Sequence, residues 1–231
     1  MYTLYIGNKN YSSWSLRPWV LMRTLGIPFE ERLLRFEGPA GHAKFRAVSP
    51  TGMVPCLHDG ATVVWDTLAI TEYLAERHPG VWPKDPAARA WARCAAAEMH
   101  GGFATMRNIC THNIGVRVRL RDRAPLAPDL ARLTELWSEG LTRFGGPFLA
   151  GADFTAVDAF YAPVANRLQT YGLTLGPTAD AYATRLRDLP AMRDWTKAAL
   201  AENFRETGHE AELLAAGTLL EDLRVTETQN G

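Results

Sequence analysis

The chain has few cysteines, and they do not form pairs. Its 231 residues include only Cys56, Cys94 and Cys110, an odd number without C-x-x-C spacing. This pattern fits a reducing compartment better than a disulfide scaffold. The six histidines show no H-x-x-x-H pair, and no G-x-S-x-G sequence occurs, so the signatures of a zinc site and of a hydrolase elbow are both missing. We therefore expect no metal.

The chain also has no excess charge of either sign and no long apolar run. Lysine plus arginine equals aspartate plus glutamate at 25 each, so no overall field draws the protein to nucleic acid or to an anionic membrane. No segment approaches the length of a membrane span, and the N-terminus lacks a basic region followed by an apolar stretch. The 47% hydrophobic content is enough for a packed core. We expect a cytoplasmic globular protein with neither nucleic-acid nor membrane partners.

Residues 1–79 alternate short strand-like segments with helical ones, which predicts a small mixed α/β domain. The order is βαβαββα, and residues 80–84 form a linker rich in Pro and Gly. The predicted strands are Tyr2–Gly7, Phe29–Leu34, Val54–His58 and Thr62–Trp65, and the predicted helices are Ser15–Gly26, His42–Val48 and Thr67–His78.

Residues 85–231 consist of long segments rich in Ala, Leu and Arg, which predicts an all-helical second domain. Thr155 stands three residues before Asp158, the spacing of a capping box that begins a helix. The fold class is therefore α/β followed by all-α. The predicted helices are Pro86–His112, Pro128–Phe144, Thr155–Tyr171, Ala179–Leu186 and Pro190–Asn203.

The most informative segment is Tyr11–Trp19, which carries Ser12 and Ser13 at the point where an apolar strand pattern leads into a helical one. Hydroxyls at a helix start lie beside unpaired backbone N–H groups, which favour an anion. Two later segments are similar junctions: Ser49–Pro55 is a turn before a strand, and Trp65–Ile70 joins a strand to a helix. Taken singly, each is also what an ordinary helix cap or edge proline looks like.

Taken together, the three segments resemble the glutathione transferase family. The pattern is most similar to the serine-type, zeta-like group, the group of maleylacetoacetate isomerase. Ser12 and Ser13 match that group's serine pair, and Arg17 matches its arginine. Trp14 stands where the group has cysteine, and Leu16 where it has tryptophan.

The resemblance extends through most of the chain and implies a fold. Residues 1–79 would form a thioredoxin-like glutathione-binding domain, and residues 85–231 the family's helical domain. It also implies glutathione as co-substrate and a homodimer.

Catalysis in such a protein requires the glutathione thiol to ionise. A free thiol has a pKa of about 8.5, and lowering it by about two units requires roughly 2.7 kcal/mol of preference for the anion. A hydroxyl that donates to a charged acceptor contributes about 1.5–3 kcal/mol, and a helix N-terminus about 0.3–1 kcal/mol. Our hypothesis is that Ser12 donates to the sulfur and that Ser13 assists, which makes both serines catalytic candidates.

The resemblance also assigns a glutathione-binding role to the later junctions. The Val54–Pro55 bond would be cis, and the Val54 backbone would pair with the cysteinyl part of the tripeptide. Asp66 would bind the α-amine of the γ-glutamyl end, while Thr67 and the N–H groups of the following helix would bind its carboxylate. His42 could reach the glycyl carboxylate.

The electrophile would lie between the first helix and the start of the helical domain. The resemblance points to Trp14, Phe103, Met106, Arg107 and Tyr171 as its lining. The leading hypothesis is a glutathione transferase that acts on a small hydrophobic electrophile. The alternatives are a glutathione-dependent cis–trans isomerase of the maleylacetoacetate type, which uses an arginine of the helical domain with Arg167 nearby in sequence, and a non-catalytic binding module of the same fold.

Overall fold

The computed structural model describes residues 1–225 and begins with a four-stranded sheet. The strands are β1 (Tyr2–Ile6), β2 (Phe29–Leu33), β3 (Cys56–Asp59) and β4 (Thr62–Trp65), and they lie in the order β2-β1-β3-β4. β1 pairs parallel with β2, whereas the β1–β3 and β3–β4 pairs are antiparallel. Because a parallel pair needs a crossover, a helix must connect β1 to β2.

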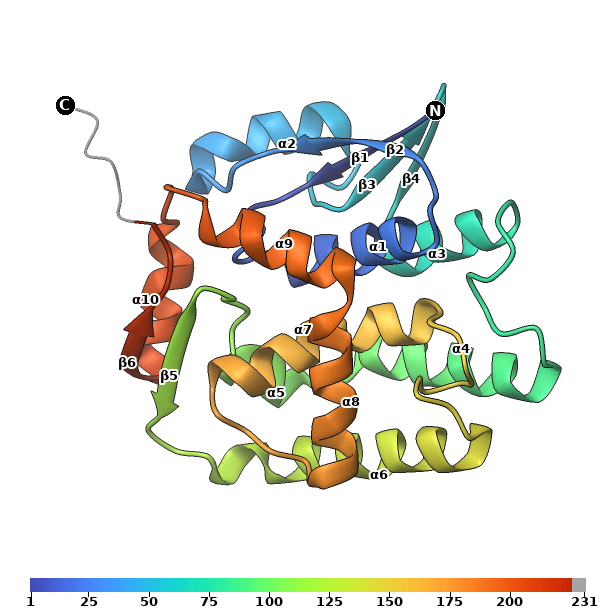
Figure 1. Ribbon diagram of the computed structural model, residues 1–231. Helices are drawn as coiled ribbons and strands as arrows, with labels where there is room; N and C mark the ends of the chain where they lie inside the picture. The colour runs from blue at the N-terminus through green and yellow to red at the C-terminus, as the bar shows by residue number, and fades with distance from the viewer. Residues whose placement is uncertain (226–231) are drawn as a thin grey trace.

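That crossover helix is α1 (Ser13–Thr24), and it lies on the same face of the sheet as α3 (Thr67–Ala75). The short helix α2 (His42–Val48), preceded by a 3-10 turn at Gly38–Gly41, lies on the other face (Figure 1). The predicted order βαβαββα and the thioredoxin-like class are therefore confirmed.

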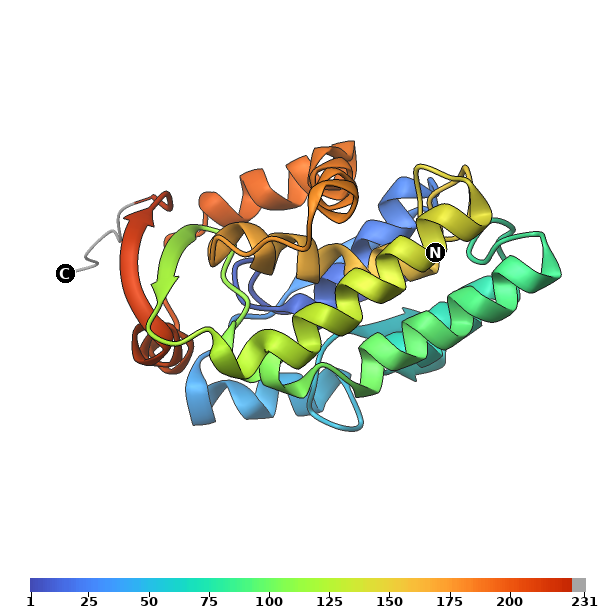
Figure 2. The ribbon, with the colours of Figure 1, turned by 90° about the horizontal axis from the view of Figure 1, so that it is seen from below.

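The second domain is built around one helix that is buried along its whole length. This helix, α7 (Ala156–Thr170), has almost no exposed residue. It packs against α1 of the first domain and against two helices of its own domain, α4 (Pro86–Gly101) and α8 (Pro177–Asp188). Figure 2 shows α4 and α6 running side by side along the outside of this domain. The helices are α4 (Pro86–Gly101), α5 (Ala104–Ile109), α6 (Ala127–Phe144), α7 (Ala156–Thr170), α8 (Pro177–Asp188), α9 (Pro190–Leu200) and α10 (Thr207–Ala216), with a 3-10 turn at Ala124–Leu126.

The second domain is helical, as predicted, but it also contains a two-stranded ribbon that the prediction of an all-helical domain did not include. β5 (Val116–Leu120) pairs antiparallel with β6 (Gly217–Asp222), and both views place these strands side by side at one end of the domain (Figures 1 and 2). The residues of β5 alternate between apolar and arginine, and its apolar side chains are buried while Arg119 is exposed. An alternation with a period of two residues indicates a strand, but it was missed because the surrounding sequence has the periodicity of helices.

The helix predicted at Pro86–His112 is two helices, because the chain turns at Gly102 and Phe103. Phe103 has a left-handed backbone, with φ 53° and ψ 39°. Its ring is buried and lies edge-on to the ring of Tyr161, with 6.5 Å between the centroids. Tertiary packing thus holds a conformation that local propensity disfavours. Among residues 1–225, no helix is long and apolar enough to cross a membrane.

Candidate functional site

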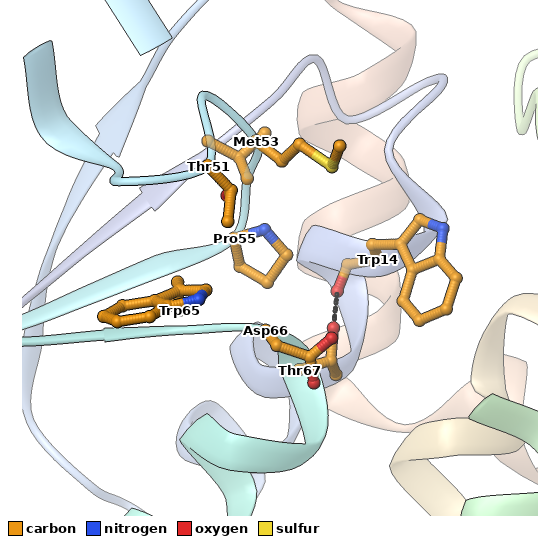
Figure 3. Close-up of a pocket in the computed structure, with 8 residues that line it drawn as sticks. Trp14, Thr51, Met53, Pro55, Trp65, Asp66 and Thr67 are labelled. Atoms are coloured by element: carbon orange, nitrogen blue, oxygen red, sulfur yellow. Dashed lines mark hydrogen bonds between the residues drawn. The ribbon is translucent and has the colours of Figure 1, made fainter. Parts of the chain in front are cut away.

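A cavity of about 290 Å³ lies where α1, the turn before β3 and the start of α3 meet. Figure 3 shows Trp14 on one side of it, Met53 and Pro55 at the turn, and Trp65 with Asp66 at the end of β4. Its lining residues are Trp14, Thr51, Met53, Val54, Pro55, Trp65, Asp66 and Thr67. The second and third junctions of the sequence therefore come together beside Trp14, a residue of the first.

The start of α3 carries a backbone distortion. Asp66 is the N-cap, and its Oδ1 accepts a hydrogen bond from the Leu68 N–H at 2.8 Å. Its φ of 72° with ψ of 139° is sparsely populated by residues other than glycine, and such strain gathers at functional sites. The buried Thr67 donates from its hydroxyl to the Trp14 carbonyl at 3.5 Å, the dashed line in Figure 3. This bond joins two of the predicted motifs directly.

The Val54–Pro55 peptide bond is cis, which confirms the expectation that the resemblance gave. β3 begins at Cys56, so Val54 and Pro55 precede the strand and are not part of it. Cys56 is buried, as a small core residue would be, and burial raises the pKa of its thiol.

A second cavity, of about 410 Å³, adjoins the first and shares Trp14, Met53 and Val54 with it. Ser12 and the predicted binding residue His42 both line it. The remaining lining residues are Tyr11, Phe36, Glu37, Gly38, Phe45, Gly52, Glu206 and His209. Glu206 and His209 belong to the start of α10, which the sequence analysis did not connect with the site.

Ser12 is the N-cap of α1, and its hydroxyl belongs to a short chain of hydrogen bonds. The Ser12 Oγ accepts from the Ser15 N–H at 3.2 Å and donates to the Ser15 Oγ at 2.7 Å. The Ser15 Oγ in turn accepts from the Gly7 N–H at 3.1 Å, at the end of β1. Ser12 therefore caps a helix, as a serine at this position commonly does, and it also faces a cavity that could hold a ligand.

Ser13 has different neighbours from Ser12. It is buried, it does not line either cavity, and its Oγ accepts from the Arg167 Nη2 at 3.4 Å. The Arg167 Nε donates to the Cys110 carbonyl at 2.7 Å, while its Nη1 is buried without a hydrogen-bond partner in the described part of the chain. α7 thus places a guanidinium directly against the serine pair.

A second buried guanidinium, that of Arg17, lies one turn after Ser13 on α1. Its side chain stacks on two rings, with 4.1 Å from its Cζ to the Trp14 ring centroid and 5.1 Å to that of Phe160. Its Nε and Nη1 are buried without a partner among residues 1–225. Arg17 was matched to the family motif, but no role was predicted for it.

The electrostatics of this region are unusual because the charges are unbalanced. Burial and the neighbouring arginines Arg167 and Arg107 lower the pKa of Arg17 to about 9. Burial lowers the pKa of Arg167 to about 10, and Arg107 lowers it further. Both side chains still carry their charge at neutral pH, yet within the described residues no carboxylate oxygen lies within 4.0 Å of either guanidinium. Buried charges without a partner are costly, so the pair is suited to receive an anion.

Trp14 lies between this arginine pair and the cavities. Besides Arg17, it contacts Arg107, whose Cζ is 5.5 Å from the Trp14 ring centroid, and the ring of His100 at 5.1 Å. The His100 Nε2 is 3.4 Å from the Asp66 Oδ2, and burial lowers the pKa of His100. Of these two predicted lining residues, Trp14 lines both cavities, whereas Arg107 lines neither and reaches the site only through its contact with the Trp14 ring.

The other three residues predicted to line the electrophile site lie in the core. Phe103, Met106 and Tyr171 are buried and line neither cavity. The Tyr171 hydroxyl donates to the Thr111 carbonyl at 2.9 Å, so its polar end is used within the helical domain. In the described part of the chain, no group of three or more His, Cys, Asp or Glu residues could hold a metal ion.

Comparison with known proteins places both domains in one family. Residues 11–77 match the family model described as the glutathione S-transferase N-terminal domain, and residues 118–198 match its C-terminal domain. The two matches include the serine pair, the cis proline, the start of α3 and the whole of α7, but they end before α10.

Individual proteins similar to this chain include an isomerase and glutathione S-transferases. A probable maleylacetoacetate isomerase of Caenorhabditis elegans is 27% identical over 217 residues, covering 89% of this chain and 95% of the relative. Glutathione S-transferase GstB of Escherichia coli is 27% identical over 202 residues, covering 80% and 93%. A theta class glutathione S-transferase structure from Xanthomonas axonopodis pv. citri, with glutathione bound, superimposes with a TM-score of 0.62 at 27% identity and covers 84% of this chain and 96% of its own.

Proposed function

Because the chain belongs to the glutathione S-transferase family, we propose that it is an enzyme that transfers the glutathione thiolate to a small hydrophobic electrophile. In such a conjugation the thiol proton leaves, the sulfur bonds to an electrophilic carbon, and the displaced group or the added proton balances the product. Reactions of this kind detoxify reactive compounds. The observation that carries the proposal is the Ser12 hydroxyl at the start of α1, in the wall of the second cavity.

Ser12 can stabilise a thiolate without losing any hydrogen bond. In the free protein it donates to the Ser15 Oγ at 2.7 Å. Since two hydroxyls share this bond, its direction can reverse: Ser15 then donates to Ser12, and Ser12 donates to the sulfur. Ser12 still accepts from the Ser15 N–H, so the N-cap is preserved. Ser13, polarised by the adjacent Arg167 guanidinium, adds to the positive field near the sulfur.

The rest of the tripeptide fits the two adjoining cavities. The γ-glutamyl end lies in the first cavity, where the Asp66 carboxylate binds the amine and the N–H groups at the start of α3 bind the carboxylate. The cysteinyl backbone pairs with Val54, which lines both cavities. The glycyl end extends into the second cavity toward His42. The support is that these residues, predicted from separate segments, line two cavities that share Trp14, Met53 and Val54.

The test is the thiol pKa of bound glutathione in the Ser12→Ala variant, measured by ultraviolet absorbance of the thiolate. Loss of the hydroxyl should raise that pKa by one to two units, about 1.4–2.7 kcal/mol, and lower turnover more than affinity. Thr170→Ala is a matched control, because Thr170 is a buried hydroxyl that donates to a distant carbonyl, that of Asn113, at 2.8 Å. An unchanged pH–rate profile in Ser12→Ala would remove Ser12 from this role.

A second candidate function, glutathione-dependent cis–trans isomerisation of a carboxylate substrate, is favoured by the buried arginines. Thiolate addition to a conjugated cis double bond leaves a single bond that can rotate, and expulsion of the thiolate restores the double bond in the trans form. An acidic substrate needs cations, and Arg17 and Arg167 are buried without carboxylate partners in the described residues. Similarity to a probable maleylacetoacetate isomerase agrees with this chemistry.

Two assays separate the candidate functions. A neutral aromatic electrophile tests conjugation, and a cis-unsaturated diacid tests isomerisation. An isomerase should lose the second activity in Arg167→Met while Ser12→Ala lowers both. If wild-type protein binds glutathione but turns over neither substrate, the fold serves as a binding module instead.

We also propose a homodimer through the edge of the sheet and α3. The first domain exposes an apolar hollow there, lined by Val63, Val64, Trp65, Leu68 and Ala69 together with two acidic side chains. Trp65 is 44% exposed and the neighbouring Met53 69% exposed. Adjacent large apolar side chains of this kind mark protein interfaces.

A further inference from the structure

One wall of the second cavity comes from outside the segments that match the family. The helical-domain match ends at residue 198, whereas Glu206 and His209 stand at the start of α10. These two residues line the same cavity as Ser12 and His42. α10 therefore adds an imidazole to the site that neither the sequence motifs nor the family match accounts for.

The His209 ring is held in one orientation. Its Nδ1 lies 2.7 Å from the Glu206 Oε2, and the same carboxylate accepts from the His209 backbone N–H at 2.8 Å. The ring is stacked between Tyr11 and Phe36, with centroids 4.9 Å and 5.4 Å away and interplanar angles of 28° and 26°. The ring cannot turn without breaking both stacks and the bond to Glu206.

This arrangement leaves one nitrogen available. Since the Glu206 carboxylate is an acceptor only, Nδ1 carries a proton, and Nε2 is the end that can bind a ligand. Nε2 has no hydrogen-bond partner within residues 1–225. The His209 side chain is 35% exposed, so this edge of the ring is accessible.

The other charged groups of the cavity leave a carboxylate few places to bind. Glu37 already pairs with Lys44 at 2.5 Å, and Glu206 pairs with His209. The imidazoles of His42 and His209 are thus the side chains among those lining residues that can offer a positive charge to an anion. If the γ-glutamyl end lies at Asp66 and the sulfur at Ser12, the end of glutathione in this cavity is its glycyl carboxylate.

We propose that His209 binds the glycyl carboxylate of glutathione through Nε2, with Glu206 and the two flanking rings as positioning groups. The proposal rests on the proposed glutathione-dependent function and adds to it a recognition residue from α10. A protonated imidazole donates from Nε2 while Nδ1 keeps its bond to Glu206.

The experiment compares glutathione with its glycyl ethyl ester, which lacks the terminal charge, by titration calorimetry. Wild-type protein should bind glutathione about tenfold more tightly than the ester, the scale of one charged hydrogen bond. His209→Phe keeps an aromatic ring between Tyr11 and Phe36 but removes the donor. This variant should bind glutathione about tenfold more weakly and bind the ester with unchanged affinity, so that the preference for glutathione disappears.

Two further variants make the result decisive. His209→Gln keeps a donor and should retain part of the preference, whereas His78→Phe is the control. His78 also has a ring contact and a hydrogen bond, both with Tyr2, but lies outside both cavities. If His209→Phe weakens the binding of glutathione and of the ester equally, His209 only shapes the cavity and does not bind the carboxylate. If the variant still prefers glutathione as strongly as the wild-type protein does, the assignment is overturned. A wild-type protein that binds neither ligand would instead contradict the proposed function itself.

Discussion

The two buried arginines behind the serine pair are the least expected side chains of the site. Arg17 and Arg167 come from different domains, yet in the described residues two guanidinium nitrogens of Arg17 and one of Arg167 are buried without a partner. Ring stacking of Arg17 and two hydrogen bonds of Arg167 offset only part of the cost of desolvation, because a buried charge also needs an opposite charge or a full set of hydrogen bonds. Their presence is better explained by what they bind than by what they stabilise.

Replacement of Arg17 by methionine should therefore separate stability from binding. Arg17→Met removes an unpaired buried charge and keeps an apolar side chain against Trp14 and Phe160, so the free energy of unfolding should stay level or rise by about 1–4 kcal/mol. The affinity for maleate, a small cis-dicarboxylate, should fall at the same time. Urea denaturation and calorimetry measure the two quantities. A loss of several kcal/mol in stability with unchanged maleate binding would show that Arg17 is structural.

Individual residues differed in how far the sequence could predict them. The cis bond at Val54–Pro55 was expected from the family resemblance, which rests on motifs that are local in the chain. No sequence pattern indicated that His209 belongs to the site, because α10 brings it to the cavity from nearly two hundred residues after Ser12. Only the tertiary structure brings such a pair together.

Among the elements, α7 begins with a carboxylate that holds several segments of the helical domain together. Thr155 and Asp158 form the predicted capping box, and Asp158 accepts from the Thr155 N–H at 2.9 Å. The same carboxylate accepts from the Leu149 N–H at 3.0 Å and the Tyr182 hydroxyl at 2.8 Å. Burial raises the pKa of Asp158 to about 6, against these hydrogen bonds. One carboxylate thus connects the start of α7 to the preceding loop and to α8.

Loss of the cap should lower stability and leave the site intact. Thr155→Ala should reduce the free energy of unfolding by about 0.5–2 kcal/mol, the usual effect of removing an N-cap side chain. The affinity of the folded protein for glutathione should not change, because Thr155 lies in neither cavity. Thermal melting and calorimetry check the two statements. Weaker glutathione binding at an unchanged melting temperature is the contrary result.

The sequence predicted elements well where one periodicity extended over many residues. The strands and helices of residues 1–79 were predicted in the right order, and α6 was predicted to within one residue at its start. The prediction failed where an element was short, or where the interruption of a helix depended on tertiary packing. β5 has five residues and a partner that lies about a hundred residues later, and the break at Phe103 depends on burial of its ring.

At the scale of the whole molecule, the proposed homodimer predicts that one surface residue controls assembly. Ala69 is exposed on α3 and lines the apolar hollow. Ala69→Arg places a charge in the interface and should give monomers, while the fold is retained because arginine is a good helix former. Sedimentation measures the mass, and Ala90→Arg, an exposed site on α4, is the matched control. Unaltered assembly in Ala69→Arg would place the interface elsewhere.

The C-terminal part of the described chain is fastened to the residues before the serine pair. The Arg224 guanidinium, with a side chain 2% exposed, binds Glu210 at 2.6 Å and Asp222 at 2.7 Å. Glu210 accepts from the Tyr11 hydroxyl at 2.8 Å, and Glu202 accepts from the Lys9 N–H at 2.7 Å. The loop that carries the serine pair is therefore held by segments from the opposite end of the chain.

The pairing of β6 with β5 has a consequence for how the protein is made. A ribosome releases the sheet, α1 and the serine pair early, but the α10 wall and the strand that secures it emerge last. A nascent chain can therefore fold its first domain with the thiol cleft still open on one side. In the proposed mode of binding, the tripeptide would meet its complete binding surface only after α10 and β6 had been translated and folded.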